Sequence, residues 1–284
     1  MKSERAGCHV DGRKGASNVL RRIALNGEKA IAQGISRNVL KLIAITTITI
    51  GHFFLYTFTT FRAFGMGKPW ASILCYVCFV GPPIFMFFIS EGFQYTSSKI
   101  RYGKRLLIFA LITQVAHAVT ADPQLGFRFK TFFFEWNVFF ALLFGFIDLC
   151  ILTSEKKWIV KIAGVLATMI LSYLTNTEWW IFGQLIIIAY YFLRKHCVLK
   201  FFVVSLLIYL MFVFSDCNFG GDFVVSFYSR GMLYYMPFSV IGVALSSFFY
   251  KGRNGKKSKF LQYFFYVFYP LHLLLIDASM FLAG

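Results

Sequence analysis

The chain has 284 residues, of which 58% are hydrophobic and 14% are charged, and its mean hydropathy is +0.66. This composition excludes an ordinary soluble domain, which needs far more polar surface. The net charge of +17 would suit a nucleic-acid partner in a soluble protein. Here the basic residues separate apolar segments, so we expect no nucleic acid and attribute the charge to orientation in a lipid bilayer.

The first 37 residues are polar and basic, and we interpret them as a cytoplasmic tail. Within this tail, residues 20–33 would form either a basic amphipathic helix on the membrane surface or disordered chain. Residues 38–284 contain no internal repeat, low-complexity segment or long soluble insertion. They are predicted to form a single transmembrane domain.

Apolar runs compatible with membrane spans of about 17–25 residues follow the tail. They lie at 39–61, 71–95, 104–121, 132–152, 157–175, 178–194, 198–215, 232–250 and 260–282. Some runs are short or closely spaced, so eight or ten spans stay open as alternatives to nine. Since helices satisfy their own backbone polar groups in lipid, the predicted fold is all-α, a polytopic integral membrane helix bundle.

The distribution of basic residues predicts the orientation of this bundle. With the amino terminus inside, the inner segments hold 24 Lys and Arg residues and the outer segments hold 5, which accounts for all 29. Cytoplasmic loops carry an excess of Lys and Arg. The sequence therefore predicts an N-in, C-out protein with an odd number of spans.

Three histidines, His52, His117 and His272, fall near one depth of the predicted bundle. Ionisable groups inside spans are costly and usually face a cavity or a partner, although each histidine could instead be a hydrogen-bonded packing residue. Lys41 precedes His52 by 11 residues, which is within about 20° of three full helical turns and places both on one face. Pro270 stands two residues before His272 and frees a carbonyl in its helix, as often happens where a membrane helix lines a site.

A basic and aromatic cluster is expected at the inner end of the second and third spans. It contains Tyr95, Arg101, Lys104 and Arg105, residue types that bind phosphates through charge and bidentate hydrogen bonds. Ordinary loop charge on the cytoplasmic side explains most of the same residues. Glu91 lies next to this cluster, and we expect it to pair with Arg105 or Lys104.

Other polar residues in or near the spans give weaker signals. Asp148, near the inner end of the fourth span, is a minor candidate. Glu178, Asp216 and Asp222 could attract a cationic substrate from outside, but we interpret them as solvated loop residues. The "CYVC" motif at 75–78 lacks nearby further ligands, so we predict structural cysteines and no metal site.

Five stretches of the sequence form a recognisable set, namely "LKLIAITTITIGH" (40–52), "PPIFMFFISEGFQYT" (82–96), "YGKRLLIFALITQ" (102–114), "NVFFALLFG" (137–145) and "YFFYVFYPLHLLLI" (263–276). Together they resemble the TraX family of membrane proteins, which is associated with N-terminal acetylation of conjugative pilin. The TraX family in turn looks related to acyltransferase-3 type transmembrane acyltransferases, in which a basic residue and a histidine eleven positions apart mark the first helix. The TraX pattern usually has Asp-His where this chain has Gly51 and His52.

The resemblance implies that cytoplasmic acetyl-CoA is the acyl donor. Its phosphates would dock at Arg105, Lys104 and Arg101, and its pantetheine arm would follow the Lys41–His52 face. His52 would be the general base, or would carry the acetyl group covalently.

The same resemblance adds roles for other residues of the matching stretches. His272 would orient the acceptor or stabilise the oxyanion, and Asn137 and Tyr269 are further site candidates. The acceptor would be the amino terminus of a pilin or a similar small membrane or exported peptide, with a sugar hydroxyl as a variant, at the bacterial inner membrane. The alternative is a transporter or a non-enzymatic component of a conjugation or secretion assembly; the oligomeric state stays open.

Overall fold

The computed structural model describes residues 34–62, 69–120, 127–218, 230–252 and 259–283. Residues 1–33, which include the predicted amphipathic segment, lie outside the described residues. The described part is built from helices: α2 (Arg37–Arg62), α3 (Pro69–Tyr76), η1 (Val77–Val80), α4 (Gly81–Tyr95), α5 (Lys99–Thr120), α6 (Phe129–Phe134), α7 (Val138–Leu152), α8 (Trp158–Leu174), α9 (Trp180–Phe192), α10 (Cys197–Asn218), α12 (Arg230–Ala244), η2 (Leu245–Phe249) and α13 (Lys259–Ala283). The prediction of an all-α bundle is confirmed.

Each expected span falls on one helical segment, in some cases a broken one. In the described residues, four segments are long and apolar enough to cross a bilayer, namely Arg37–Leu55, Ile73–Tyr95, Phe129–Leu152 and Cys197–Ser215. Shorter apolar helices occur at Trp158–Leu174, Trp180–Phe192, Tyr235–Phe249 and Tyr263–Ala278. The chain therefore has the helices of a polytopic membrane protein, while nine crossings and the N-in orientation stay predictions.

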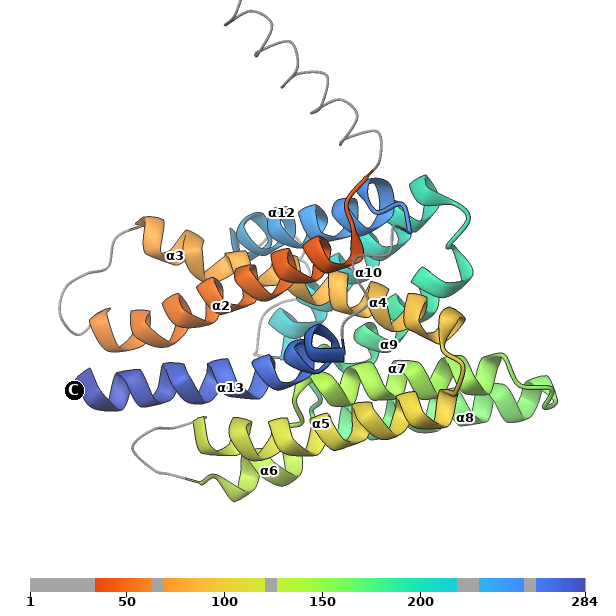
Figure 1. The fold of residues 1–284 in the computed structure, drawn as a ribbon, viewed down its shortest axis with the longest axis horizontal. Helices are drawn as coiled ribbons and strands as arrows, with labels where there is room; N and C mark the ends of the chain where they lie inside the picture. The colour runs from red at the N-terminus through yellow and green to blue at the C-terminus, as the bar shows by residue number, and fades with distance from the viewer. Residues whose placement is uncertain (1–33, 63–68, 121–126, 219–229, 253–258, 284) are drawn as a thin grey trace, which may run out of the picture.

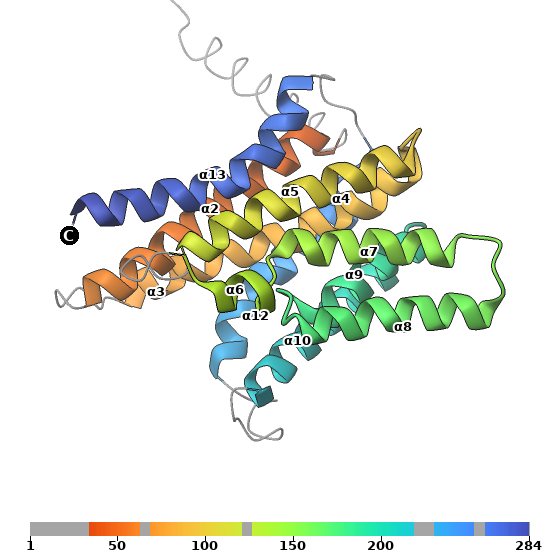
Figure 2. The same ribbon diagram turned by 90° about the horizontal axis from the view of Figure 1, so that it is seen from below.

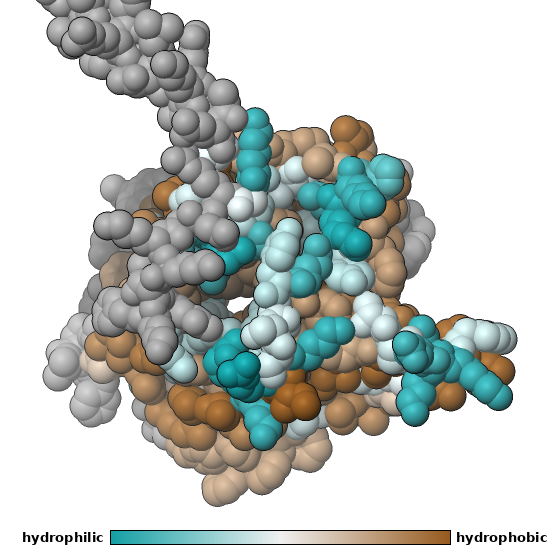
Figure 3. Space-filling view, turned by 45° about the vertical axis from the view of Figure 1, so that its right-hand side comes forward, coloured by the Kyte–Doolittle hydropathy of each residue, from teal (hydrophilic) through white to brown (hydrophobic). Residues whose placement is uncertain are grey.

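The helices run roughly along one direction, and the links between them lie toward the two ends of the bundle (Figure 1). The links at 96–98, 153–157 and 193–196 lie toward the right-hand end, which we call the inner end, and α2 begins nearer the middle and runs away from that end. The carboxyl terminus and the last turns of α2 lie at the opposite, outer end. Figure 3 looks partly onto the inner end and shows hydrophilic side chains gathered on it, with apolar surface beside them. The sorting of basic segments between the two sides of a membrane stays a prediction.

Helix α7 forms the centre of the bundle, because its first nine residues, Val138–Phe146, are all buried. A helix that is apolar on every side is typically enclosed by other helices. In contrast, α5 and α8 expose large apolar side chains outward, such as Leu111 at 50% and Ile170 at 59%. Broad apolar surface of this kind suits contact with lipid.

A 3₁₀ segment, η1, interrupts the second apolar run between α3 and α4, where the sequence reads "VCFVGPP". Pro82 and Pro83 stand at the first positions of α4, where a missing backbone donor is tolerated. Neighbouring helices approach η1 closely: a Cβ on Gly242 would lie 2.3 Å from the Val80 carbonyl oxygen. Small residues permit such backbone contact between membrane helices.

The final helix, α13, continues through Pro270 and is bent along its length (Figure 2). At the inner end the chain before α2 also belongs to the bundle, since the Ile35 amide donates to the Phe249 carbonyl at 2.8 Å. The last residues of the segment that the sequence assigned to a tail therefore contact the helices.

Candidate functional site

The described bundle encloses a cavity of about 720 Å³. Side chains from α2, α3, η1, α4, α5, α7, α10, α12 and α13 line it, together with Glu178 and Trp179 from the link between α8 and α9. Most of the lining is aromatic or aliphatic. The volume lies within the range of about 300–1,000 Å³ that is usual for small-molecule sites.

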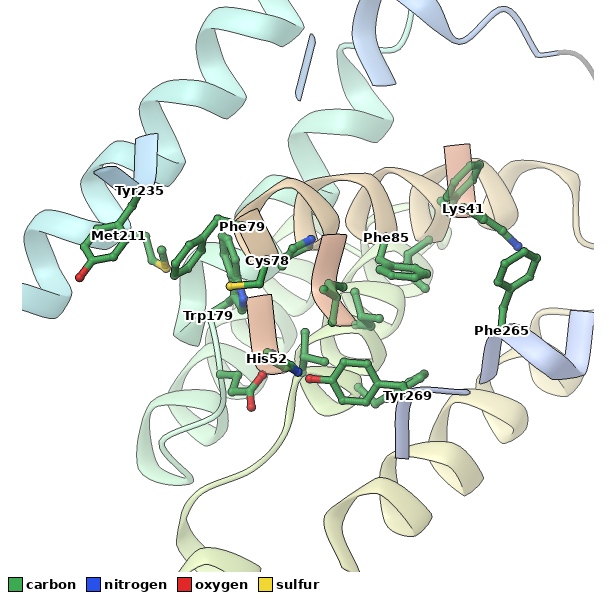
Figure 4. Close-up of a pocket in the computed structure, with 18 of the residues that line it drawn as sticks. Lys41, His52, Cys78, Phe79, Phe85, Trp179, Met211, Tyr235, Phe265 and Tyr269 are labelled. Carbon is green, nitrogen blue, oxygen red and sulfur yellow. The ribbon is translucent and has the colours of Figure 1, made fainter. Parts of the chain in front are cut away.

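Lys41 and His52 both line this cavity, as expected if one face of α2 carries them. At 1.5 Å per residue, their Cα atoms lie about 16 Å apart along the helix. The Lys41 ammonium stands over the rings of Phe88 and Phe265, at 5.2 and 5.0 Å from their centroids. Figure 4 shows Lys41 and Phe265 at one end of the cavity and His52 further along it.

His52 is hydrogen-bonded to His272 across the contact between α2 and α13. The distance from His52 Nδ1 to His272 Nε2 is 2.9 Å, and the His272 Nδ1 atom is 3.1 Å from the Phe268 carbonyl oxygen. A carbonyl accepts only, so His272 Nδ1 carries a proton and, in a neutral ring, Nε2 must accept. His52 Nδ1 is then the donor, which leaves the lone pair of a neutral His52 on Nε2. The sequence predicted a common depth for these residues but not their contact.

Gly51 explains why no aspartate precedes His52 in this chain. A Cβ at position 51 would lie 2.4 Å from Cys78 Cβ, 2.6 Å from Cys78 N and 2.9 Å from the Cys75 carbonyl oxygen. Since van der Waals contact between carbon atoms begins near 3.5 Å, α2 could not stay against η1 with any side chain there. His272 supplies the hydrogen bond that orients the His52 imidazole instead.

Tyr269 also lines the cavity, one turn of α13 before His272. Its ring stands edge-on to both imidazoles, with centroid distances of 6.2 Å to His52 and 5.1 Å to His272. Its hydroxyl points toward His52 (Figure 4). The structure thus brings three of the predicted site residues together on two helices.

Arg105 is the member of the predicted basic cluster that lies next to the cavity. Its guanidinium is 5.5 Å from the centroid of the Tyr102 ring and hydrogen-bonds Tyr266, and both tyrosines line the cavity. Arg101 and Lys104 are exposed on the surface of α5. Of the three basic residues, Arg105 is therefore the one that contacts side chains of the cavity lining.

The prediction that Glu91 pairs with Arg105 or Lys104 was wrong. Glu91 Oε1 lies 3.4 Å from Arg37 Nη2 and accepts a short hydrogen bond from the Tyr250 hydroxyl. This cluster joins the start of α2 to the end of η2, on the inner side of α4, rather than to Arg105 or Lys104. Tyr95 is 74% exposed and does not line the cavity.

Asn137 has a structural role that the sequence did not predict. It is fully buried and caps α7, since its Oδ1 accepts from the Phe139 amide at 2.9 Å. Its Nδ2 donates to the Ala110 carbonyl at 3.0 Å and to Gln114 Oε1 at 2.7 Å. These bonds use its polar atoms, and its side chain does not line the cavity.

Neither His117 nor Asp148 lines the cavity. His117 is half-buried and is close enough to His52 and Glu178 to interact with both electrostatically. Asp148 is buried between α7 and α8 and is hydrogen-bonded to Thr168 at 2.5 Å.

Glu178 lines the cavity and is not a solvated loop residue, so that interpretation was wrong. The side chains of Asp216 and Asp222 lie outside the described residues. The sequence did contain a signal for Glu178, because "EWW" at 178–180 sets a carboxylate directly before two tryptophans at a predicted membrane boundary.

Fold and site together define a class of protein, a membrane-type helix bundle with a cavity lined by a lysine and by a histidine that is hydrogen-bonded to a second histidine behind it. The family model described as TraX protein matches residues 36–278, and the chain belongs to the TraX family. It is also similar to a protein of Dichelobacter nodosus named "Probable fimbrial assembly protein FimC, serogroup H1". The two are 28% identical over 264 residues, which cover 87% of this chain and 100% of that protein. No solved structure matches the chain.

Proposed function

We propose that this protein is an acetyltransferase of the bacterial inner membrane. It transfers the acetyl group of acetyl-CoA to an amino group, most simply the amino terminus of a pilin or another small membrane or exported peptide. The observation that carries this proposal is the cavity, because it is lined both by Lys41 near the inner end and by His52.

The inner part of the cavity suits an anionic donor with a long arm. Arg105, and beyond it the exposed Lys104 and Arg101, offer positive charge for the phosphates of acetyl-CoA. The aromatic and aliphatic lining between Lys41 and His52 suits the uncharged pantetheine arm. A thioester carried along this route would meet His52 about 16 Å from the Lys41 position.

His52 has the tautomer that a general base needs. With Nδ1–H donated to His272, a neutral His52 holds its lone pair on Nε2, which can take the proton of the attacking amine. The amine nitrogen forms a bond to the thioester carbonyl carbon and the carbon–sulfur bond breaks. The coenzyme thiolate leaves and takes up a proton, which the His52 imidazolium can return. His272 is a positioning residue in this scheme.

A second candidate function is supported by the relative's name. A protein named as a fimbrial assembly protein could act in assembly without catalysis, as a membrane component of the machinery. In that case the histidine pair would hold α2 against α13 and would serve no reaction. The two functions differ in whether acetyl transfer depends on His52.

The test is transfer of radiolabelled acetyl groups from acetyl-CoA to peptides with a free amino terminus, catalysed by the purified full-length protein in lipid. We expect His52→Ala to lower the rate at least about 100-fold, because general-base catalysis typically contributes 10²–10⁴. His196→Ala is the matched control, since His196 is exposed between α9 and α10 and does not line the cavity. Equal rates for the unchanged protein and His52→Ala would overturn the catalytic proposal.

A further inference from the structure

The end of the cavity away from Lys41 is built from aromatic rings. Phe79 is central to them, with its ring centroid 5.2 Å from Phe212, 5.2 Å from Tyr235 and 6.4 Å from Trp179. All four side chains line the cavity, and they come from η1, α10, α12 and the link before α9. Figure 4 shows Phe79, Trp179 and Tyr235 on the side of His52 opposite to Lys41.

A carboxylate belongs to the same part of the cavity. The Glu178 amide donates to the Trp136 carbonyl at 2.8 Å, and its side chain accepts a hydrogen bond from the Val138 amide at the start of α7. His117 and Cys78 are close enough to Glu178 to interact with it electrostatically. A carboxylate removed from water is costly unless hydrogen bonds or a cation compensate for the lost hydration.

The backbone that presents these groups is strained. Asn176, Trp179 and Trp180 have φ of 41°, 66° and 39°, a left-handed region that bulky residues rarely adopt. Each such residue costs about 1–3 kcal/mol and persists only where the surroundings hold it, commonly at ligand sites. Here the Thr177 amide donates to Ser172 and the Trp180 amide donates to Thr177, at 3.0 and 2.8 Å. Both Glu178 and Trp179 of this turn line the cavity.

A carboxylate that lines the same cavity as several aromatic rings is complementary to an ammonium group. The ring faces attract a cation, more strongly when it is desolvated, and the carboxylate neutralises its charge. An uncharged hydroxyl acceptor would gain little from either feature.

We propose that this part of the cavity, with Glu178 as counter-ion and the rings of Phe79, Trp179 and Tyr235 around it, binds a primary ammonium group. Identifying the ligand as the acceptor amine rests on the proposed function. In that role the site selects amines over alcohols and holds the ammonium in the cavity that His52 lines. His52 Nε2 then takes one proton from it and releases that proton to water, so that the imidazole is neutral again when the resulting amine attacks the thioester.

The test is equilibrium binding of two tritium-labelled probes to the full-length protein in lipid nanodiscs, without acetyl-CoA. One is an apolar tripeptide amide with a free amino terminus, and the other is its desamino analogue, which has hydrogen in place of the amino group. At about pH 6.5, well below the α-amino pKa of about 7.7–8.0, the first probe is a cation. We expect it to bind roughly 30-fold more tightly than the analogue.

Glu178→Gln keeps the size of the side chain and removes its charge, so it should abolish most of this preference. Glu155→Gln is the matched control, because Glu155 is exposed in the link between α7 and α8. Phe79→Leu is a second variant, which removes one ring face and should weaken binding of the cationic probe about fivefold without changing binding of the analogue. Equal affinities of the two probes for the unchanged protein, or an unchanged preference in both variants, would overturn the proposal.

The binding assay separates this inference from the proposed function. A Glu178-dependent preference in a protein that transfers no acetyl group would support the ammonium site and contradict the acetyltransferase. Acetyl transfer to amines with the same KM for the amine in Glu178→Gln as in the unchanged protein would support the enzyme and contradict the site.

Discussion

Replacing Gly51 with alanine tests how α2 holds His52 in place. The added Cβ would lie 2.4 Å from Cys78 Cβ and 2.6 Å from the Cys78 backbone nitrogen. Both distances are about 1 Å short of ordinary contact, and a backbone atom cannot turn aside as a side chain can. Helix α2 must therefore move about 1 Å away from η1. Such overpacking typically costs about 1–3 kcal/mol, and we expect the upper part of this range.

The same shift would move His52 relative to the rest of the cavity. A misplacement of about 1 Å can cost about 100-fold in rate, so we expect Gly51→Ala to lower acetyl transfer by that order and the melting temperature by roughly 5 °C or more. Thermal unfolding and the radiolabel assay measure the two effects. Gly103→Ala is the control, because its nearest neighbour is a Phe146 side-chain atom at 3.3 Å and alanine favours the helix. A Gly51→Ala protein with unchanged stability and rate would refute the reasoning.

Three further predictions concern residues around the site. Asn137→Ala should lower the free energy of unfolding by about 2–4 kcal/mol in denaturation measurements, because it removes a helix cap and the two hydrogen bonds that Asn137 Nδ2 donates to the Ala110 carbonyl and to buried Gln114 Oε1. A loss below about 0.5 kcal/mol would contradict that role. Glu91→Gln should lower the free energy of unfolding by about 1–2 kcal/mol, a value discounted because the Arg37 side chain is 33% exposed. A double-mutant cycle with Arg37→Gln measures the coupling energy of the pair, and a coupling energy near zero would contradict a role for the pair. Arg105→Gln should raise KM for acetyl-CoA about tenfold and leave kcat nearly unchanged in steady-state kinetics, whereas a fall in kcat alone would argue against phosphate binding.

The helices could be predicted from the sequence because apolar runs between basic links are strong, local signals. The break at Val77–Val80 could not, since it depends on close packing of α2 and α12 against η1. From the sequence, the first residue of the helix bundle was also placed too far along the chain. Arg37 reads as part of a basic tail, but it is the first residue of α2 and pairs with Glu91, 54 positions away along the chain.

The part of the candidate site that lies on a single helix could be predicted from residue spacing. Lys41 and His52 share a face of α2 by helical spacing alone, and both line the cavity. The contact of His52 with His272 spans 220 residues, so only the fold reveals it. The surroundings of Asn137 and Glu178 could not be predicted from the sequence, because the links before α7 and before α9 are hydrogen-bonded to each other through the backbone of Trp136. This pairing buries one side chain as a helix cap and turns the other into the cavity.

An experimental structure of the protein with coenzyme A bound tests the central claim most directly. We predict density for the coenzyme sulfur beside His52, the pantetheine arm along the α2 face between Lys41 and His52, and the phosphates next to Arg105. Coenzyme A bound with its phosphates away from Arg105 and its thiol outside the cavity would contradict the account.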